Sequence, residues 1–146
     1  MKRKKLLELA DFIIKSRKPF DMRTFGEFVK ETPESKCRFV GCAIGCGVMA
    51  KICPKELYLD LEEDYDYDFE GKKYTFLKLK NSKTGSLQFK AISEAYDIDI
   101  TDAYYLFSDF HYPITDENDK ITRKMVADRI REYVTKHIKN TKRVKK

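Results

Sequence analysis

The sequence predicts a compact single domain of the α+β class, mainly α-helical with a small β-hairpin, assembled around a buried helix rich in cysteine and glycine. Three observations support this fold class. The 146 residues suit one domain. Hydrophobic residues make up 42% of the chain, enough for a core. Apolar residues recur at helical spacing near both ends, whereas residues 65–79 alternate with a period of two. We expect the domain to span residues 1–139, with a basic C-terminal tail at 140–146.

The first predicted element is an amphipathic helix over residues 3–16, which Pro19 keeps from continuing. Glu8 and Asp11 interrupt the apolar stretch that follows the basic start, so the segment does not read as a signal peptide. The positions expected to face the core are Leu6, Leu9, Ala10 and Ile13. In the connecting segment that follows, the aromatic residues Phe20, Phe25 and Phe28 are expected to anchor the chain to the core.

The second predicted helix contains the segment CRFVGCAIGCGVMAKIC at residues 37–53 and ends before Pro54. At 100° per residue from Val40, one apolar stripe holds Val40, Ile44, Val48 and Ile52, and another holds Cys42, Cys46, Met49 and Cys53. A helix that is apolar on all sides is normally buried on all sides. Its glycines cost about 1 kcal/mol each relative to alanine. We therefore expect them to allow close approach of a neighbouring backbone.

Residues 65–79 predict a β-hairpin. Aromatic and acidic residues alternate over YDYDFE, which is typical of a half-buried strand. A turn at residues 70–71 would place Tyr67 opposite Tyr74 and Tyr65 opposite Phe76. It would also place Asp68 opposite Lys73. The predicted register thus pairs aromatic residues on one face and opposite charges on the other.

Three further helices are predicted in the C-terminal half. A short one lies in SLQFKAISEAY with Ser86 as its N-cap, and another starts at Thr101. The last is capped by Thr122. Its apolar stripe holds Val126, Ile130, Tyr133, Val134 and His137.

Charge is distributed in blocks of alternating sign, although the net charge is +6. Residues 57–70 carry seven acidic and no basic groups, and residues 71–90 carry six basic and no acidic groups. Residues 91–119 are acidic again, and residues 120–146 are strongly basic. This pattern lets neighbouring segments attract one another, but each exposed pair contributes only about 0–1 kcal/mol. Its larger effect is expected on the choice of binding partner.

The cysteines allow two chemical alternatives to simple packing. Cys42 and Cys46 lie one helical turn apart and could hold a metal together with His111 or His137. Cys37 lies near the predicted helix start beside basic residues, which favours a reactive thiol. Packing is nevertheless favoured, because free cysteine commonly behaves as a small buried hydrophobe. No catalytic motif is present, so we expect neither an enzyme nor a bound cofactor.

A combination of motifs resembles a family of small uncharacterised proteins of bacteriophages and bacteria. The motifs are C-x4-C-x2-G at Cys37, Cys42 and Gly45, a later segment DAYYLF with an LF motif, and a C-terminal helix TRKMVADRIREYV with a VAxRI core. The resemblance covers roughly residues 20–53 and 86–135. It departs at Arg38 and Phe39, where the family usually has glycine and threonine. The resemblance implies a phage or prophage origin and carries no reaction or catalytic residue.

Together these features favour a noncatalytic phage or prophage accessory protein that binds a host or phage protein through a charged, aromatic surface. The expected contact residues are Tyr65, Asp66, Tyr67, Asp68 and Phe69, because tyrosine-rich patches are common in interfaces. The first alternative is nucleic-acid binding through the basic termini, namely Lys2, Arg3, Lys4, Lys5, Lys142, Arg143, Lys145 and Lys146. The second is a cysteine-based metal or thiol protein. We expect a cytoplasmic location and no membrane contact, because no window approaches the roughly 20 apolar residues that span a bilayer.

Overall fold

The computed structural model describes residues 1–17, 19–30, 38–66, 73–113 and 120–144. Within these ranges it contains five α-helices, one short 3₁₀-helix and four strands. In chain order the elements are α1 (Arg3–Lys15), β1 (Gly26–Lys30), β2 (Arg38–Val40), α2 (Ala43–Met49), β3 (Leu57–Asp66), β4 (Lys73–Asn81), α3 (Gln88–Tyr96), α4 (Ile100–Phe107), η1 (Asp109–His111) and α5 (Arg123–Val144).

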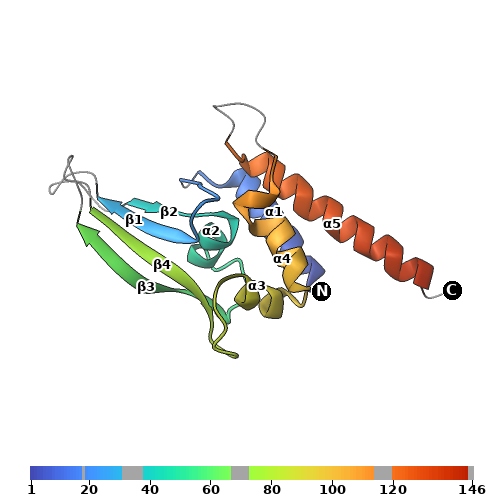
Figure 1. Ribbon diagram of the computed structural model, residues 1–146. Helices are drawn as coiled ribbons and strands as arrows, with labels where there is room; N and C mark the ends of the chain where they lie inside the picture. Colours follow the sequence, from blue (N-terminus) through green and yellow to red (C-terminus); the bar gives the residue numbers. More distant parts are fainter. Residues whose placement is uncertain (18, 31–37, 67–72, 114–119, 145–146) are drawn as a thin grey trace.

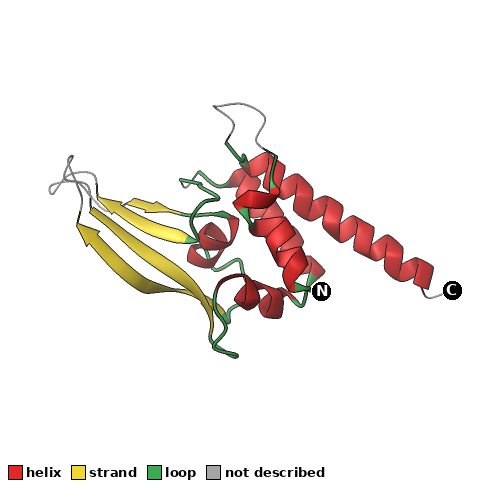
Figure 2. Cartoon of the chain, viewed as in Figure 1, coloured by secondary structure: helices red, strands yellow, loops and turns green. Residues whose placement is uncertain are grey.

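The molecule has a sheet end and a helical end (Figure 1). Helices α1, α4 and α5 form the helical end, while α2 and α3 lie between them and the sheet and contact both. Figure 2 shows the strands gathered on the side away from α5. The N-terminal amine forms an ion pair at 3.1 Å with Asp97, the residue that follows α3.

The four described strands form one antiparallel sheet in the order β2-β1-β4-β3. The sequence-based prediction contained only the hairpin, so a mainly α-helical fold overstated the helices, and the chain is a compact α+β fold. Strand β1 was expected to be an irregular connection. Its Phe28 lies opposite Phe39 of β2, with the ring centroids 5.7 Å apart. This contact stabilises the pairing of β1 with β2. The prediction of a single hairpin did not include that part of the sheet.

The predicted hairpin is confirmed by β3 and β4, but its register differs by two residues. Tyr65 lies opposite Tyr74 and Asp66 opposite Lys73. A shift of two residues leaves each position on the same face of the sheet, because side chains alternate with a period of two. Tyr65 thus faces an aromatic residue and Asp66 a basic one, as predicted in kind. Phe76, however, lies opposite Glu63 rather than Tyr65, so the second predicted aromatic pair is wrong. The predicted turn at residues 70–71 lies outside the described residues.

The predictions for the first and last helices are confirmed. All four expected core residues of α1 are at most 1% exposed. In α5, Val126, Ile130, Tyr133 and Val134 are buried, whereas the His137 side chain, expected on the same stripe, is 41% exposed. The Thr122 hydroxyl caps this helix by accepting a hydrogen bond from the backbone N–H of Met125 at 3.2 Å. Contacts between α1 and α5 form the centre of the helical end.

The cysteine-rich segment forms a shorter helix than predicted. Val40 belongs to β2, Cys42 is the N-cap of α2, and Cys53 follows the helix. The two stripes expected along one continuous helix are therefore wrong. The expectation of burial is confirmed for residues 41–47, whereas Met49, also expected on a buried stripe, is 40% exposed. In α3 the N-cap is Leu87 rather than Ser86, whose hydroxyl donates to Glu94 at 2.8 Å instead.

In the part of the chain that the structure describes, none of the helices is both long enough and apolar enough to cross a membrane.

Candidate functional site

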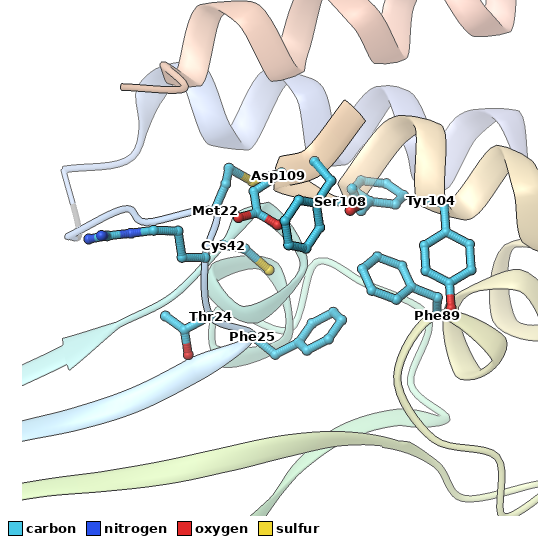
Figure 3. Close-up of a pocket in the computed structure, with 11 residues that line it drawn as sticks. Met22, Thr24, Phe25, Cys42, Phe89, Tyr104, Ser108 and Asp109 are labelled. Carbon is cyan, nitrogen blue, oxygen red and sulfur yellow. The ribbon is translucent and has the colours of Figure 1, made fainter. Parts of the chain in front are cut away.

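A pocket of about 180 Å³ opens where the sheet meets the helices (Figure 3). Its walls come from the segment before β1, the N-cap of α2, helix α3, the C-terminal half of α4 and the start of η1. The residues that line it are Met22, Arg23, Thr24, Phe25, Cys42, Phe89, Tyr104, Phe107, Ser108, Asp109 and Phe110. Because these residues come from distant parts of the sequence, the pocket exists only in the folded chain.

Three aromatic rings form one wall of this pocket. The ring centroids of Phe25 and Phe89 are 5.2 Å apart, and Phe89 stacks on Tyr104 at 4.3 Å. Figure 3 shows these side chains together, with Cys42 and Asp109 across the pocket from them. Such ring contacts are worth about 0.5–1.5 kcal/mol beyond simple burial. They give the pocket a preformed, largely apolar wall.

Phe110 forms the rim of the pocket and is 92% exposed. Its neighbour Phe107 is 1% exposed and belongs to the core. An almost fully exposed phenylalanine gains nothing from folding, since its hydrophobic area stays in water. Beside a pocket with an aromatic wall, it is the most accessible apolar side chain in the described part of the chain.

Charged groups lie at the pocket beside the aromatic wall. The Arg23 guanidinium binds the Asp21 carboxylate, with Nη2 donating to Oδ2 at 2.8 Å and Nε to Oδ1 at 3.0 Å. These hydrogen bonds lower the pKa of Asp21 despite its partial burial. Glu27 lies nearby, and burial together with repulsion from Asp21 raises its pKa. Asp109 supplies a further carboxylate directly in the pocket lining.

Arg129 of α5 holds the segment that carries Phe110. Its Nη1 donates to the backbone oxygens of Tyr105 at 2.9 Å and His111 at 2.7 Å. The same guanidinium lies over the rings of Tyr105 and Tyr112, 4.4 and 3.7 Å from their centroids. These contacts join both ends of the turn between α4 and η1 to the last helix. Arg129 is the arginine of the VAxRI motif, so this part of the motif has a structural role.

Gly45 positions the wall that contains Phe25. A Cβ atom at Gly45 would collide with the backbone oxygen of Phe25, so only glycine allows α2 to approach this segment. The expected close approach of a neighbouring backbone is thus confirmed at this glycine. Cys42 lies at the start of the same helix and lines the pocket, and its sulfur accepts a hydrogen bond from the Gly45 N–H at 3.5 Å.

The described cysteines are buried within the protein. Burial raises the pKa of the Cys42 and Cys53 thiols to about 12. Both therefore stay protonated near neutral pH. The Cys46 thiol donates to the backbone oxygen of Gly41 at 3.3 Å. Cys37, the predicted reactive thiol, lies outside the described residues.

The metal site considered from the sequence needed His111 or His137 near Cys42 and Cys46. His111 lies at the end of η1, with its ring 6.4 Å from that of Tyr104. His137 packs on Tyr133, with ring centroids 4.0 Å apart. Over the residues that the structure describes, no group of three or more histidine, cysteine, aspartate or glutamate side chains is arranged to hold a metal ion.

The predicted partner-binding residues lie at the far end of the sheet. Tyr65 and Asp66 are the last residues of β3, while Tyr67, Asp68 and Phe69 lie outside the described residues. The structure thus places the start of this stretch at the end of the sheet that lies away from the helices (Figure 1). None of the residues that line the pocket belongs to β3.

The predicted basic residues are distributed over α1, α5 and the chain end. Lys2 and Lys5 form ion pairs with Glu56 at 3.3 Å and Glu8 at 3.6 Å. Arg3 and Lys4 are exposed. The backbone of Lys142 and Arg143 continues α5, and Lys145 and Lys146 lie outside the described residues.

Comparisons with known proteins identified no relative of this chain. A scan against protein-family models, a search of curated proteins and a search of solved structures each gave no match to the chain. The site must therefore be interpreted from its own geometry.

The pocket residues were not predicted from the sequence. Phe89 and Tyr104 lie on apolar helix faces that predict core packing, and Arg23 lies in a segment without a motif. The available signal was the segment SDFHYP, in which polar residues flank Phe110 on a loop. An aromatic residue flanked by polar residues in a loop is expected to be exposed and not to pack in the core.

Proposed function

We propose that this protein is a noncatalytic binding module that docks a segment of a protein partner at the aromatic pocket. The observation that supports this function is Phe110, which is 92% exposed at the rim of the pocket. Exposed aromatic residues next to a concavity are typical interface anchors, because burying them in a partner recovers hydrophobic free energy. The contact residues thus differ from the hairpin residues expected from the sequence.

The size of the pocket favours a protein partner over a small-molecule ligand. Pockets for drug-sized ligands and cofactors have volumes of about 300–1,000 Å³. The pocket here holds about 180 Å³, which suits one large side chain. A partner that inserts one residue and covers Phe110 at the same time would use both features.

The biological setting is proposed from the sequence resemblance alone. On that basis the protein is an accessory protein of a phage or prophage that acts in the bacterial cytoplasm on a host or phage protein. Thiol chemistry is the less favoured function, since the pKa of Cys42 and Cys53 is raised to about 12 by burial. A thiolate nucleophile or ligand would need the opposite shift.

The test uses site-specific photo-cross-linking followed by binding measurements. A photoreactive phenylalanine analogue at position 110 is compared with the same analogue at position 61, because Leu61 is 55% exposed on β3 and does not line the pocket. We expect a discrete bacterial protein to cross-link from position 110 only. With that partner purified, Phe110→Ala should weaken binding at least about tenfold, and Leu61→Ala should not. Equal binding by wild type and Phe110→Ala would exclude this function.

Nucleic-acid binding is the second candidate, because α1 and α5 pack on each other and both carry basic residues. Asp97 pairs with the N-terminal amine, and Asp102 lies 3.9 Å from His137 of α5. The same two carboxylates reduce the positive potential there. If this function holds, DNA or RNA affinity falls steeply with added salt and falls further in the double variant Arg3→Glu, Lys4→Glu. Absence of binding at low salt would remove it.

A further inference from the structure

The charges around the aromatic pocket identify the kind of side chain that it accepts. We propose that the pocket takes an arginine side chain of the protein partner, with the guanidinium over the aromatic rim and hydrogen-bonded to Asp109. This inference rests on the proposed docking function and specifies the chemistry of the docked residue.

The first argument is the balance of charge at the pocket. Arg23 feels three carboxylates, those of Asp21, Glu27 and Asp109. Its guanidinium is held by Asp21 in a two-point contact, so this pair has no net charge. Lys120 also acts electrostatically on Asp21. With Arg23 neutralised by Asp21, Asp109 is the remaining charged side chain of the pocket lining, so the pocket attracts a cation and repels an acidic residue.

The second argument is the state of Asp109. Within the described ranges its carboxylate takes part in no side-chain hydrogen bond or ion pair, although Asp109 lines the pocket. Figure 3 shows this carboxylate on the side of the pocket that faces Phe25 and Phe89. A carboxylate beside aromatic rings provides both parts of a guanidinium site, because the rings bind the flat cation face and the oxygens accept its N–H groups.

The third argument comes from the opposite side of the same turn. There, Arg129 covers the rings of Tyr105 and Tyr112 and donates to two backbone oxygens. The segment 104–112 thus already binds one guanidinium through aromatic faces and oxygen acceptors. At the pocket, the same segment supplies an aromatic ring in Phe110 and an oxygen acceptor in Asp109. The Phe110 side chain is 92% exposed. An arginine from a partner would contact this ring and this carboxylate in the way that Arg129 contacts Tyr105, Tyr112 and the backbone oxygens.

The experiment measures binding of small arginine probes to the intact chain. N-acetyl-arginine N-methylamide is titrated into isotope-labelled protein, and backbone amide shifts of residues 24 and 104–110 are followed by NMR. The matched probe is the citrulline analogue, which has nearly the same shape but no charge. A norleucine analogue tests a purely apolar occupant. Asp109→Asn and Phe110→Ala are the pocket variants, and Asp99→Asn makes the same charge change outside the pocket lining.

We expect saturable shifts with the arginine probe and binding at least about fivefold weaker with citrulline or norleucine. Asp109→Asn should weaken the arginine probe about tenfold, and Asp99→Asn should leave it unchanged. Equal binding of arginine and citrulline, no effect of Asp109→Asn, or no saturable binding of arginine would each overturn the inference. The docking function would survive these outcomes if Phe110→Ala still abolished binding of the cross-linked partner, so the two failures are distinguishable.

Discussion

The guanidinium carbon of Arg129 lies 3.7 Å from the ring centroid of Tyr112. The Tyr112 hydroxyl in turn donates to the backbone oxygen of Leu106 at 2.6 Å. Together these two residues connect α5, the end of α4 and the segment after η1. The turn that presents Phe110 is therefore fixed by contacts behind it, and the exposed ring is held on a rigid support.

Replacement of Arg129 by lysine should disturb this support. Lysine keeps the charge but has no planar cation that can lie over Tyr105 and Tyr112 while a nitrogen donates to both backbone oxygens. We expect Arg129→Lys to lower the free energy of unfolding by about 1–2 kcal/mol, measured by urea denaturation. Arg131→Lys is the control, because Arg131 pairs with Asp11 at the surface. That change should cost less than about 0.5 kcal/mol. Equal effects of the two variants would contradict the proposed role of Arg129.

Replacement of Gly45 by alanine should destabilise the protein, against the usual trend. In an unconstrained helix this change stabilises by about 1 kcal/mol. Here the new methyl group would meet the Phe25 backbone oxygen, so we expect a loss of about 2–3 kcal/mol in thermal or urea unfolding. The change should also weaken partner binding, because Phe25 lines the pocket. A Gly45→Ala variant more stable than the wild type would contradict the close approach of α2 to the Phe25 backbone.

The buried thiols predict a specific response to alkaline pH. The folded pKa of Cys42 and Cys53 is about 12, above the ordinary value of 9.0. The unfolded chain therefore loses these protons first, and the stability they contribute is fully present below pH 9 and is lost as pH rises toward 12. Each thiol should reduce the free energy of unfolding by about 1.4 kcal/mol per pH unit in that window.

Urea titrations between pH 9 and 10 measure this slope below the range in which the buried tyrosines add to it, and Cys53→Ala should reduce the slope. Thiol reagents provide the second measurement. At pH 8 the native protein should modify slowly at both positions, and the urea-unfolded protein rapidly, with sites assigned by mass spectrometry. Rapid native modification of Cys42 would reopen the thiol-based function.

Tyr133 supplies a test of the contact between α4 and α5. Its hydroxyl donates to Asp102 Oδ2 at 2.7 Å, and the residue is 6% exposed. Tyr133→Phe should lower the free energy of unfolding by about 1–2 kcal/mol, because it leaves a partly buried carboxylate without this donor. Tyr104→Phe is the matched control, since Tyr104 is 40% exposed and contributes its ring to the pocket. If both changes are neutral, the hydrogen bond to Asp102 does not stabilise the fold.

The structure shows which features of this fold could be predicted from the sequence. The stripes of α1 and α5 were predictable because each helix buries one continuous apolar face. The hairpin was predictable because its two strands are neighbours in the sequence. Strands β1 and β2 were not, since GEFVK has weak alternation and owes its strand structure to pairing with β4, more than 40 residues away.

The candidate site was beyond sequence-based prediction for a related reason. Phe25, Phe89 and Phe110 each lie in a different segment, and only the packing of α2, α3 and α4 brings these segments together. The cysteine segment was misjudged at its ends, because apolar periodicity does not distinguish a helix from a short strand that leads into one. What the sequence did indicate was that Cys42 and Cys46 are buried, and the structure confirms this.

Strand β3 lies at one edge of the described sheet, and residues 57–66 include five acidic and no basic positions. Edge strands are where separate molecules most easily join into aggregates. Two copies that paired at β3 would bring these acidic sequence positions together, so we expect like-charge repulsion to oppose self-association at this edge. We expect this protection to fade in acid, where the carboxylates become neutral, and in concentrated salt. The solubility of the purified protein is thus expected to depend on β3, a strand that does not line the pocket.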